Sequence, residues 1–393
     1  MFEFLREAAK EALPEATELR REFHRHPELA FAEQWTSARI SRFLQEAGIP
    51  FQGGYAGGTG LVACIEGRGA PCVALRADMD ALAIAEETGL PYASEHPGQM
   101  HACGHDGHMA CLCGVARMLW HCREQLPGTV RLLFQPGEEN AGGGRRMVDE
   151  GALEGVDAAF ALHAWPGIPA AHLALAPGTV MASADFFQIR IRGRGGHGAE
   201  PGGAVDPIVA ASHTAAALHT VVSREVNPWQ AAVLSIGKLA AGNAPNIIPD
   251  EALLEGTLRA LDEPVRAHLR EAVARVARHT AAAFRAEATV EFQEPGYPPL
   301  RNDGALAEFS ARTLRALFGE AAVQDFPHPV MTSEDFAFYT QAVPGVFLFL
   351  GNDGRAETAR PRLHTATFDF NEAALATGML ALSGLAWRFL ETR

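Results

Sequence analysis

Hydrophobic and polar positions alternate along the first part of the chain with two different spacings. Residues 2–48 carry apolar side chains at helical spacing, with few helix breakers before Gly48, which predicts a helical segment. A second helix is predicted over 108–121. Short apolar runs predict buried strands, at 61–65, 72–75, 129–134 and 157–162. Strands that alternate with helices indicate an α/β fold.

The pattern changes between residues 185 and 294, where polar and apolar residues alternate in the strands. The predicted elements there are a strand, a helix, two strands, a helix and a strand, at 185–192, 205–223, 232–239, 252–259, 263–284 and 289–292. The order βαββαβ is that of the ferredoxin-like unit. We therefore predict an inserted domain at 185–294 and a discontinuous domain made of 1–184 and 295–393. In the latter, a buried strand over 346–350 and a closing helix over 371–392 resume the α/β pattern.

Composition supports two folded domains and excludes some functions. A chain of 393 residues exceeds the roughly 250–300 residues that one hydrophobic core supports. Hydrophobic residues make up 48% and charged residues 20%, which is typical of a globular protein and not of a disordered one. The formal net charge of −14 disfavours nucleic-acid binding, because phosphate contacts need a basic patch.

The sequence also gives expectations about location. Residues 1–7 include acidic side chains and no long apolar run, so we expect no signal peptide. No stretch approaches the roughly 18 uninterrupted apolar residues of a membrane span. Six cysteines are too few for a disulfide-stapled scaffold of this length. We expect a cytoplasmic protein that does not act at a membrane.

Candidate catalytic residues gather at the ends of predicted strands. Three groups directly follow such strands: Asp78 with Asp80, Glu138 with Glu139, and His163. In open α/β sheets, ligands bind beyond the carboxyl ends of the strands. The positions therefore predict one common site, to which His364, far along the chain, is a further candidate.

The densest run of metal-ligand residue types is 101–108, His-Ala-Cys-Gly-His-Asp-Gly-His. Cys103 and His105 are two residues apart, so both could reach one metal ion from an extended or irregular loop. Thiolate, imidazole and carboxylate ligands together suit zinc, nickel, cobalt or manganese. An isolated histidine is more often a surface or satisfied core residue, but four ligand-type side chains in a glycine-containing loop are rarely needed for packing.

The adjacent carboxylates Glu138 and Glu139 repel each other unless a cation offsets the repulsion. One of them can bind a metal ion while its neighbour acts as general base for a water molecule. A solvated acidic loop is the alternative, although the preceding apolar strand and Pro136 make it less favourable.

Five segments together resemble the aminoacylase/carboxypeptidase superfamily of metallopeptidases. Within it they resemble the amidohydrolase branch, which contains hippurate hydrolases, N-acyl-amino-acid amidohydrolases and indole-acetyl-amino-acid hydrolases. The segments are 76–82, 101–108, 135–139, 333–336 and 363–365, and the resemblance extends from 21–29 past Asp369. It implies a zinc-peptidase-like catalytic domain with a mixed central sheet flanked by helices, and a ferredoxin-like insertion that serves as a lid or dimerisation domain.

The resemblance also implies the roles of individual residues. Two divalent metal ions (zinc, manganese, nickel or cobalt) would be bound by Cys103, His105, Glu139, His163 and His364, with Cys103 bridging the two. Glu138 would be the general base, and Asp80 would orient the site without binding metal. Asp78 is not carried over as a ligand, since relatives outside the branch place a His-x-Asp there and His105 fills that role. Gly137 stands where alanine is common, and we expect this difference to be tolerated.

In the inserted domain, the glycine-rich loop 193–201 matches a loop whose histidine, here His197, donates to the developing oxyanion, often across a dimer interface. Asn246 and Arg259 match positions on the substrate side. A guanidinium suits the free carboxylate of an N-acyl amino acid, although a solvated charge at a strand end is the alternative for Arg259. The implied assembly is a homodimer or homotetramer formed through this domain.

The sequence thus predicts a binuclear metal-dependent amidohydrolase that acts on N-acyl or N-aroyl amino acids. Three alternatives stay open. One is an exopeptidase or dipeptidase with the same site. The others are a binding protein that has lost catalysis and a cysteine hydrolase in which Cys103 is the nucleophile.

Overall fold

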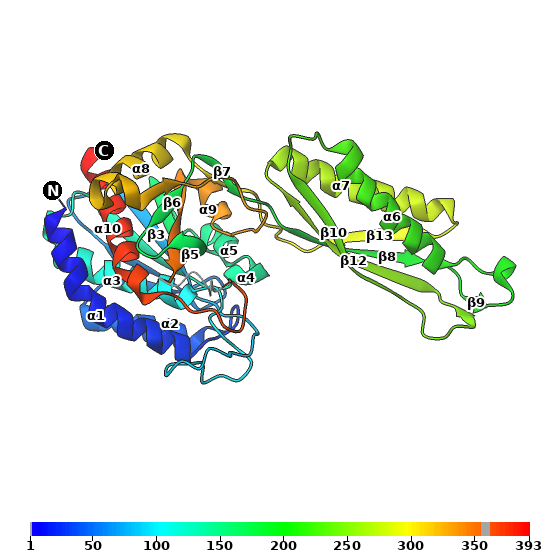
Figure 1. Cartoon of the computed structure of the whole chain (residues 1–393), viewed down its shortest axis with the longest axis horizontal. Coiled ribbons are helices and arrows are strands. Elements are labelled where there is room, and N and C mark those ends of the chain that lie inside the picture. The colour runs from blue at the N-terminus through cyan, green and yellow to red at the C-terminus, as the bar shows by residue number, and fades with distance from the viewer. Residues whose placement is uncertain (1, 355–361) are drawn as a thin grey trace. The chain divides into compact units, whose positions relative to one another are not determined.

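The computed structural model describes residues 2–354 and 362–393 (Figure 1). The chain divides into two compact units. The first comprises Met1–Gly178, Arg301–His328 and Asp335–Arg393, and the second comprises Thr179–Leu300 and Pro329–Glu334. The mixed α/β class predicted from the sequence is confirmed. The domain limits at 184/185 and 294/295 stay a prediction.

The first unit is built on a mixed sheet with the strand order β1-β2-β4-β3-β5-β16-β6-β15 among the described residues. The strands are β1 (Phe51–Tyr55), β2 (Gly60–Ile65), β3 (Cys72–Asp78), β4 (Thr129–Gln135), β5 (Ala158–Pro169), β6 (Leu173–Leu175), β15 (Val323–Asp325) and β16 (Gly345–Asp353). The central strands β4, β3, β5 and β16 run parallel. Most positions in them are buried, because helices cover both faces of the sheet.

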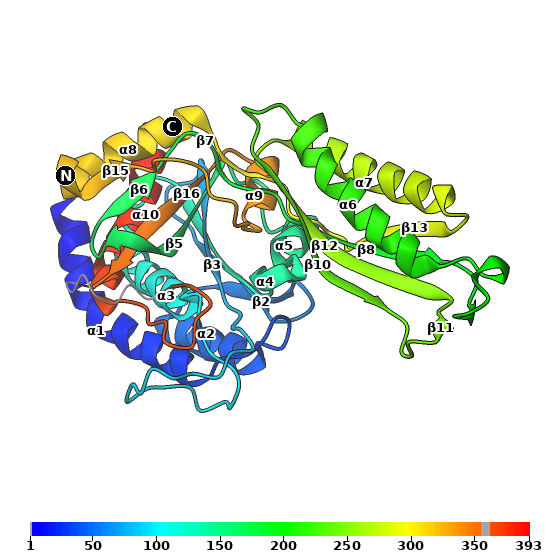
Figure 2. The ribbon, with the colours of Figure 1, turned by 45° about the vertical axis from the view of Figure 1, so that its right-hand side comes forward.

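Helices flank this sheet on two sides (Figure 2). They are α1 (Glu3–Arg25), α2 (Gln34–Ala47), α3 (His105–His121), α4 (Glu138–Ala141), α5 (Gly143–Asp149), α8 (Gly304–Phe318), α9 (Ala337–Ala342) and α10 (Leu375–Thr392). Helices α3 and α10 pack directly on β3 and β5, and α1 packs on both of these helices. Helix α5 contacts β4, and α9 contacts β16. Almost all of α3 is buried, as expected for a helix between a sheet and an outer helix layer.

The N-terminal segment differs from its prediction as one helical stretch. It forms two helices, because Pro27 lacks a backbone N–H and restricts the residue before it, so α1 ends at Arg25. The chain turns, and the Glu28 carboxylate accepts the N–H groups of Trp35 (3.0 Å) and Thr36 (2.9 Å) at the start of α2. The turn brings the residues before α2 to the sheet.

The predicted closing helix is present but begins at Leu375 after a short 3₁₀ turn. The helical segment 372–392 is long and apolar enough to cross a membrane, but 83% of its most apolar stretch is buried inside the protein. The helix packs against α1, α3 and α8. Its apolar character is accounted for by its place in the core.

The second unit contains an antiparallel sheet with the strand order β10-β12-β8-β13. In chain order its elements are β8 (Asp185–Arg192), α6 (Pro207–Glu225), β10 (Ala232–Ala241), β12 (Glu251–Ala260), α7 (Glu263–Ala283) and β13 (Glu287–Phe292). This is the βαββαβ order. Helices α6 and α7 cover one face (Figure 1), where they bury inward-facing residues such as Ile189, Leu254 and Leu258. Outside the two larger sheets, the shorter strands β9 (Gly196–His197) and β11 (Ile247–Ile248) pair with each other, as do β7 (Gly178–Met181) and β14 (Leu300–Asn302) at the boundary of the two units.

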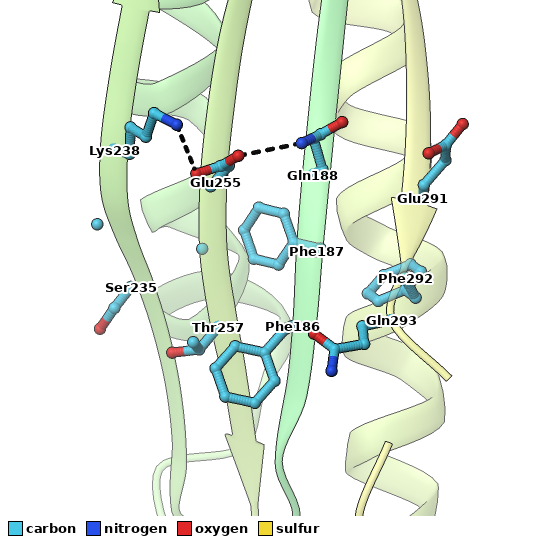
Figure 3. Close-up of a pocket in the computed structure, with 12 residues that line it drawn as sticks. Phe186, Phe187, Gln188, Ser235, Lys238, Glu255, Thr257, Glu291, Phe292 and Gln293 are labelled. Carbon is cyan, nitrogen blue, oxygen red and sulfur yellow. Dashed lines mark hydrogen bonds and ion pairs between the residues drawn. The ribbon is translucent and has the colours of Figure 1, made fainter. Parts of the chain in front are cut away.

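The other face of this sheet carries a cavity of about 610 Å³ (Figure 3). Phe186 and Thr257 lie at one end, and Lys238, Glu255 and Gln188 lie at the other. The Glu255 carboxylate is 3.0 Å from Lys238 Nζ and accepts a hydrogen bond of 3.0 Å from Gln188 Nε2. Lys238 and Glu255 therefore pair with each other, and Glu291 also lines the cavity.

Candidate metal centre

The carboxyl ends of the parallel strands β3 and β4, together with the middle of β5, bring the predicted residues together. Asp78 at the end of β3 pairs with Gln135 at the end of β4. Arg76 pairs with Ala161 of β5, so His163, two residues further along, is level with Asp78. His163 was predicted to follow a strand, but β5 continues to Pro169 because β16 pairs with it beyond the end of β3.

Helix α3 begins three residues earlier than predicted. Gly104, with a left-handed φ of +92°, precedes the helix, which then starts at His105. His105 is therefore on the first turn of a buried helix, and Cys103 lies just before it, where the sequence suggested one loop for both. The rigid helix fixes the direction of the His105 side chain.

Cys103 lies between two imidazoles. Its Sγ is 3.3 Å from His163 Nε2 and 3.3 Å from His364 Nε2. His364 Nε2 is in turn 3.1 Å from Glu139 Oε1. Cys103, Glu139 and His364 offer ligand atoms within 4.8 Å of one another, as do His105, Glu138 and Glu139. We call Cys103, His105, Glu139, His163 and His364 the ligand cluster.

The hydrogen bonds of the histidines show which nitrogens could bind metal. His105 Nδ1 donates to the Asp80 carbonyl (2.7 Å), which leaves Nε2 unprotonated in the neutral ring. This Nε2 is buried and has no hydrogen-bond partner among the described residues. His163 Nδ1 donates to the Ala164 carbonyl (2.8 Å), so its Nε2 also presents a lone pair, toward Cys103. The donor set fits a divalent transition metal.

The charge around the cluster also favours a cation. Burial lowers the pKa of His105, but the Asp78 and Asp80 carboxylates outweigh it and raise that pKa to about 10. Burial raises the pKa of the Cys103 thiol, and the carboxylates of Glu139 and Glu138 raise it further. Neighbouring carboxylates contribute to both shifts, so the site holds an excess of negative charge that a cation would offset.

His108 and Asp78, which also lie here, have their ligand atoms occupied. His108 Nδ1 donates to Asp78 Oδ1 (2.6 Å), and its Nε2 accepts the Ala164 N–H (2.8 Å). Asp78 Oδ2 accepts a hydrogen bond of 2.7 Å from Arg76 Nη1. These residues therefore form a frame around the ligand cluster. Spacing alone could not separate His108 from His105, since both belong to the same run, and only the family resemblance distinguished them.

Asp80 holds the turn that carries the two glutamates. Its carboxylate oxygens accept the N–H groups of Glu138 (3.0 Å) and Glu139 (2.9 Å). Glu138 is buried, and its Oε1 accepts a long hydrogen bond of 3.4 Å from the Asp335 N–H. Each glutamate is therefore fixed through its backbone by a carboxylate on the neighbouring strand end.

A further layer of buried polar residues was not assigned a role from the sequence. Arg76 is bound to Gln135 Oε1 (2.9 Å) and Asp335 Oδ1 (2.8 Å) besides Asp78. Asp335 also accepts the Gly144 N–H (2.7 Å). Arg76 and Asp335 lie in two of the segments that resemble the family, 76–82 and 333–336. That resemblance is the sequence signal that could have identified them.

The remaining predicted residues lie in the second unit. His197 is exposed on β9, which pairs with β11. Gly198 donates to the Asn246 carbonyl (2.8 Å), so His197 and Asn246 lie close together at one small two-stranded antiparallel sheet. Arg259, on β12, donates to Ser333 Oγ (3.0 Å).

A family model described as peptidase family M20/M25/M40 matches residues 74–388. The chain belongs to this family. It is 41% identical over 376 residues to the N-acetyl-L-cysteine deacetylase of Bacillus subtilis (strain 168), covering 95% of this chain and 88% of that protein. It is 38% identical over 375 residues to IAA-amino acid hydrolase ILR1-like 4 of Arabidopsis thaliana, covering 95% and 85%.

Among solved structures, it is similar to the YXEP protein of Bacillus subtilis, described as a dinuclear metal-binding peptidase of the M20 family. That match has a TM-score of 0.84 and 36% identity, and it covers 98% of this chain and all of the other. The M20 relationship confirms the resemblance read from the sequence. This M20 protein is a metal-dependent hydrolase of amide bonds.

Proposed function

We propose that this M20 protein is a binuclear amidohydrolase that releases amino acids from N-acyl or N-aroyl amino acids. The observation that carries the proposal is the position of Cys103 Sγ, 3.3 Å from one imidazole nitrogen on either side. A thiolate there can be shared by two ions. The acylated amino acids named in the relatives described above support the substrate class.

The ligand cluster would hold the two ions, and its thiolate, imidazole and carboxylate donors suit zinc, manganese, nickel or cobalt. When bound, such ions polarise the scissile carbonyl and acidify a water molecule. Glu138 would take the proton of the attacking water and pass it to the leaving amine. Asp80 would keep the Glu138 backbone in place through its hydrogen bond.

The second unit would supply the substrate contacts. Arg259 would bind the substrate carboxylate, Asn246 would contact the substrate, and His197 would donate to the oxyanion. We also propose that this unit is the lid and forms a homodimer or homotetramer, since it exposes apolar side chains at Ile208, Val209, Leu239 and Ile247. Sedimentation of the intact protein tests the oligomeric state. We expect the protein in the cytoplasm.

The alternatives make different demands on the site. An exopeptidase of the same family would need a pocket for a free amino terminus. A cysteine hydrolase would use Cys103 as a free nucleophile and would keep its activity after chelation of the metal. A protein that has lost catalysis would lack the base or a ligand. Here both glutamates are present, and the candidate base Glu138 is buried at the start of α4.

The test is a substrate panel on metal-reconstituted protein. It contains hippurate, N-acetyl amino acids including N-acetylcysteine, indole-acetyl conjugates and dipeptides. We expect turnover of acylated amino acids and little turnover of dipeptides. Glu138→Gln should lower kcat about 10²–10⁴-fold while the metal content is kept, and Glu154→Gln, an exposed glutamate, serves as the matched control. Preferred cleavage of dipeptides would overturn the proposal in favour of the exopeptidase.

A further inference from the structure

Glu33 is a buried carboxylate to which neither the sequence nor the proposed mechanism gives a role. It lies immediately before α2, and its exposed fraction is 0%. A buried carboxylate costs free energy unless hydrogen bonds compensate it. Glu33 Oε1 accepts the Gly137 N–H (2.9 Å), and Oε2 accepts the Thr59 hydroxyl (3.0 Å). Both oxygens are therefore engaged, and one of them reaches the turn that carries the candidate base.

Three consecutive backbone N–H groups of that turn end on two buried carboxylates. Glu33 accepts the Gly137 N–H, and Asp80 accepts those of Glu138 and Glu139. Asp80 comes from just beyond the end of β3, and Glu33 comes from the start of α2, 104 residues before Gly137. The turn is thus held by two separate parts of the fold.

The Gly137 contact decides the orientation of the turn. Gly137 has a left-handed φ of +64°, and its N–H belongs to the peptide that joins Pro136 to Gly137 and leads into the turn. Without Glu33 this N–H would be buried and unpaired, which costs about 1–3 kcal/mol and favours rotation of the peptide. A rotated peptide would displace Glu138 and Glu139 together, because both residues follow directly on the same backbone.

We propose that Glu33 is a positioning residue, which fixes the Pro136–Gly137 peptide so that Glu138 and Glu139 are presented together to the substrate and to metal. Thr59 orients Glu33 through its second oxygen. The proposal rests on the proposed function of Glu138 and Glu139, and it adds a residue from the N-terminal segment to the site. Burial, together with the Asp80 charge, raises the pKa of Glu33 to about 7.

A merely structural role for Glu33, at the start of α2, is the competing explanation. Glu28 provides the matched control, because its carboxylate accepts the N–H groups of Trp35 and Thr36 in the same helix without contacting the turn. Glu28→Ala should therefore lower stability and lower kcat much less than Glu33→Ala does. Glu33→Ala should lower both.

The decisive comparison is between Glu33→Gln and Glu33→Ala, assayed at saturating metal. A glutamine can accept the Gly137 N–H with its carbonyl and donate its amide to Thr59, so kcat should stay within about threefold of the wild type. Glu33→Ala should lower kcat about 10–100-fold with KM changed less than about twofold, because a misplaced group costs rate and not binding. Thr59→Val, a smaller perturbation, should lower kcat about 3–10-fold if Glu33→Ala fails to fold.

Metal binding gives a second readout that does not depend on the substrate. In a zinc titration against a chromophoric chelator, Glu33→Ala should weaken at least one binding step about tenfold or more, and Glu33→Gln should not. If the wild type cleaved none of the panel, the proposed function would fail while this titration still judged the role of Glu33. Three results would overturn it: wild-type metal affinity and kcat in Glu33→Ala, equal losses in the glutamine and alanine variants, or an equal loss of kcat in Glu28→Ala.

Discussion

Replacement of Gly137 by alanine, the residue common at this position in the family branch, tests whether the left-handed backbone and the Phe31 contact of this chain disfavour a Cβ there. A left-handed conformation costs an alanine about 1–2 kcal/mol relative to glycine. A Cβ on Gly137 would also lie 2.8 Å from Cζ and 2.9 Å from Cε1 of Phe31. The ring cannot easily retreat, since the Arg146 guanidinium lies 4.1 Å from its centroid. Overpacking of this kind costs about 1–3 kcal/mol, so the total loss should be roughly 2–5 kcal/mol.

The assay is urea unfolding of Gly137→Ala alone and combined with Phe31→Leu. Gly155→Ala is the control, because Gly155 has a similar φ of +72° with no atom within 4 Å of its Cβ position. The control should lose only the backbone cost, and Phe31→Leu should remove most of the additional loss at Gly137. The reasoning would be refuted if Gly137→Ala were no worse than Gly155→Ala. It would also be refuted if Gly137→Ala cost as much stability in the Phe31→Leu background as in the wild type.

Three other predictions address the metal, the pH dependence and the turn. Cys103→Ser should reduce the bound metal measured by mass spectrometry, whereas Cys111→Ala, in the core, should lower only the unfolding free energy, and equal metal content in both would contradict the ligand role. Burial lowers the pKa of His24, but hydrogen bonds to the carboxylates of Asp106 and Glu86 outweigh it and raise that pKa to about 9. Stability from His24 should therefore be complete below pH 6.5 and lost as pH rises through 9, on the order of 1–3 kcal/mol. His24→Gln should flatten this part of the stability–pH curve, and an unchanged slope would count against it. In Asp80→Asn, the side-chain amide would point an N–H donor at a backbone N–H of the turn. This should lower the free energy of unfolding by about 1–3 kcal/mol and also lower kcat. A variant as active and stable as the wild type would contradict this role of Asp80.

The agreement between expected and observed elements is closest where the pattern is local. The βαββαβ order of the second unit follows from its alternating strands and long helices. The apolar positions of these elements form the buried core of the unit. The N-terminal segment shows the limit of this reasoning. Its helical spacing continues across Pro27, yet the chain turns there, and the turn is what carries Glu33 to the sheet.

For the site, the sequence supplied the residue types and, for Asp78 and the two glutamates, the strand ends near which they lie. Cys103, His163 and His364 do meet, although 60 and 261 residues separate Cys103 from the two histidines. The ligand assignment itself stays a prediction. Neither spacing nor composition could show that His108 has both nitrogens occupied while His105 Nε2 has no partner among the described residues, because a lone pair is free or used according to what packs beside it.

Local periodicity and short motifs were enough to establish the α/β class, the M20 relationship and the residues that could do chemistry, since each of these is written in neighbouring positions of the chain. Which of those residues share a site, and what holds them there, followed from packing between distant segments. Glu33 is the example, because no motif in its own segment indicates that its carboxylate accepts the Gly137 N–H. This contact forms only in the folded protein, where the segment before α2 lies against the turn that follows β4. A buried backbone N–H needs an acceptor, and the Glu33 carboxylate provides it.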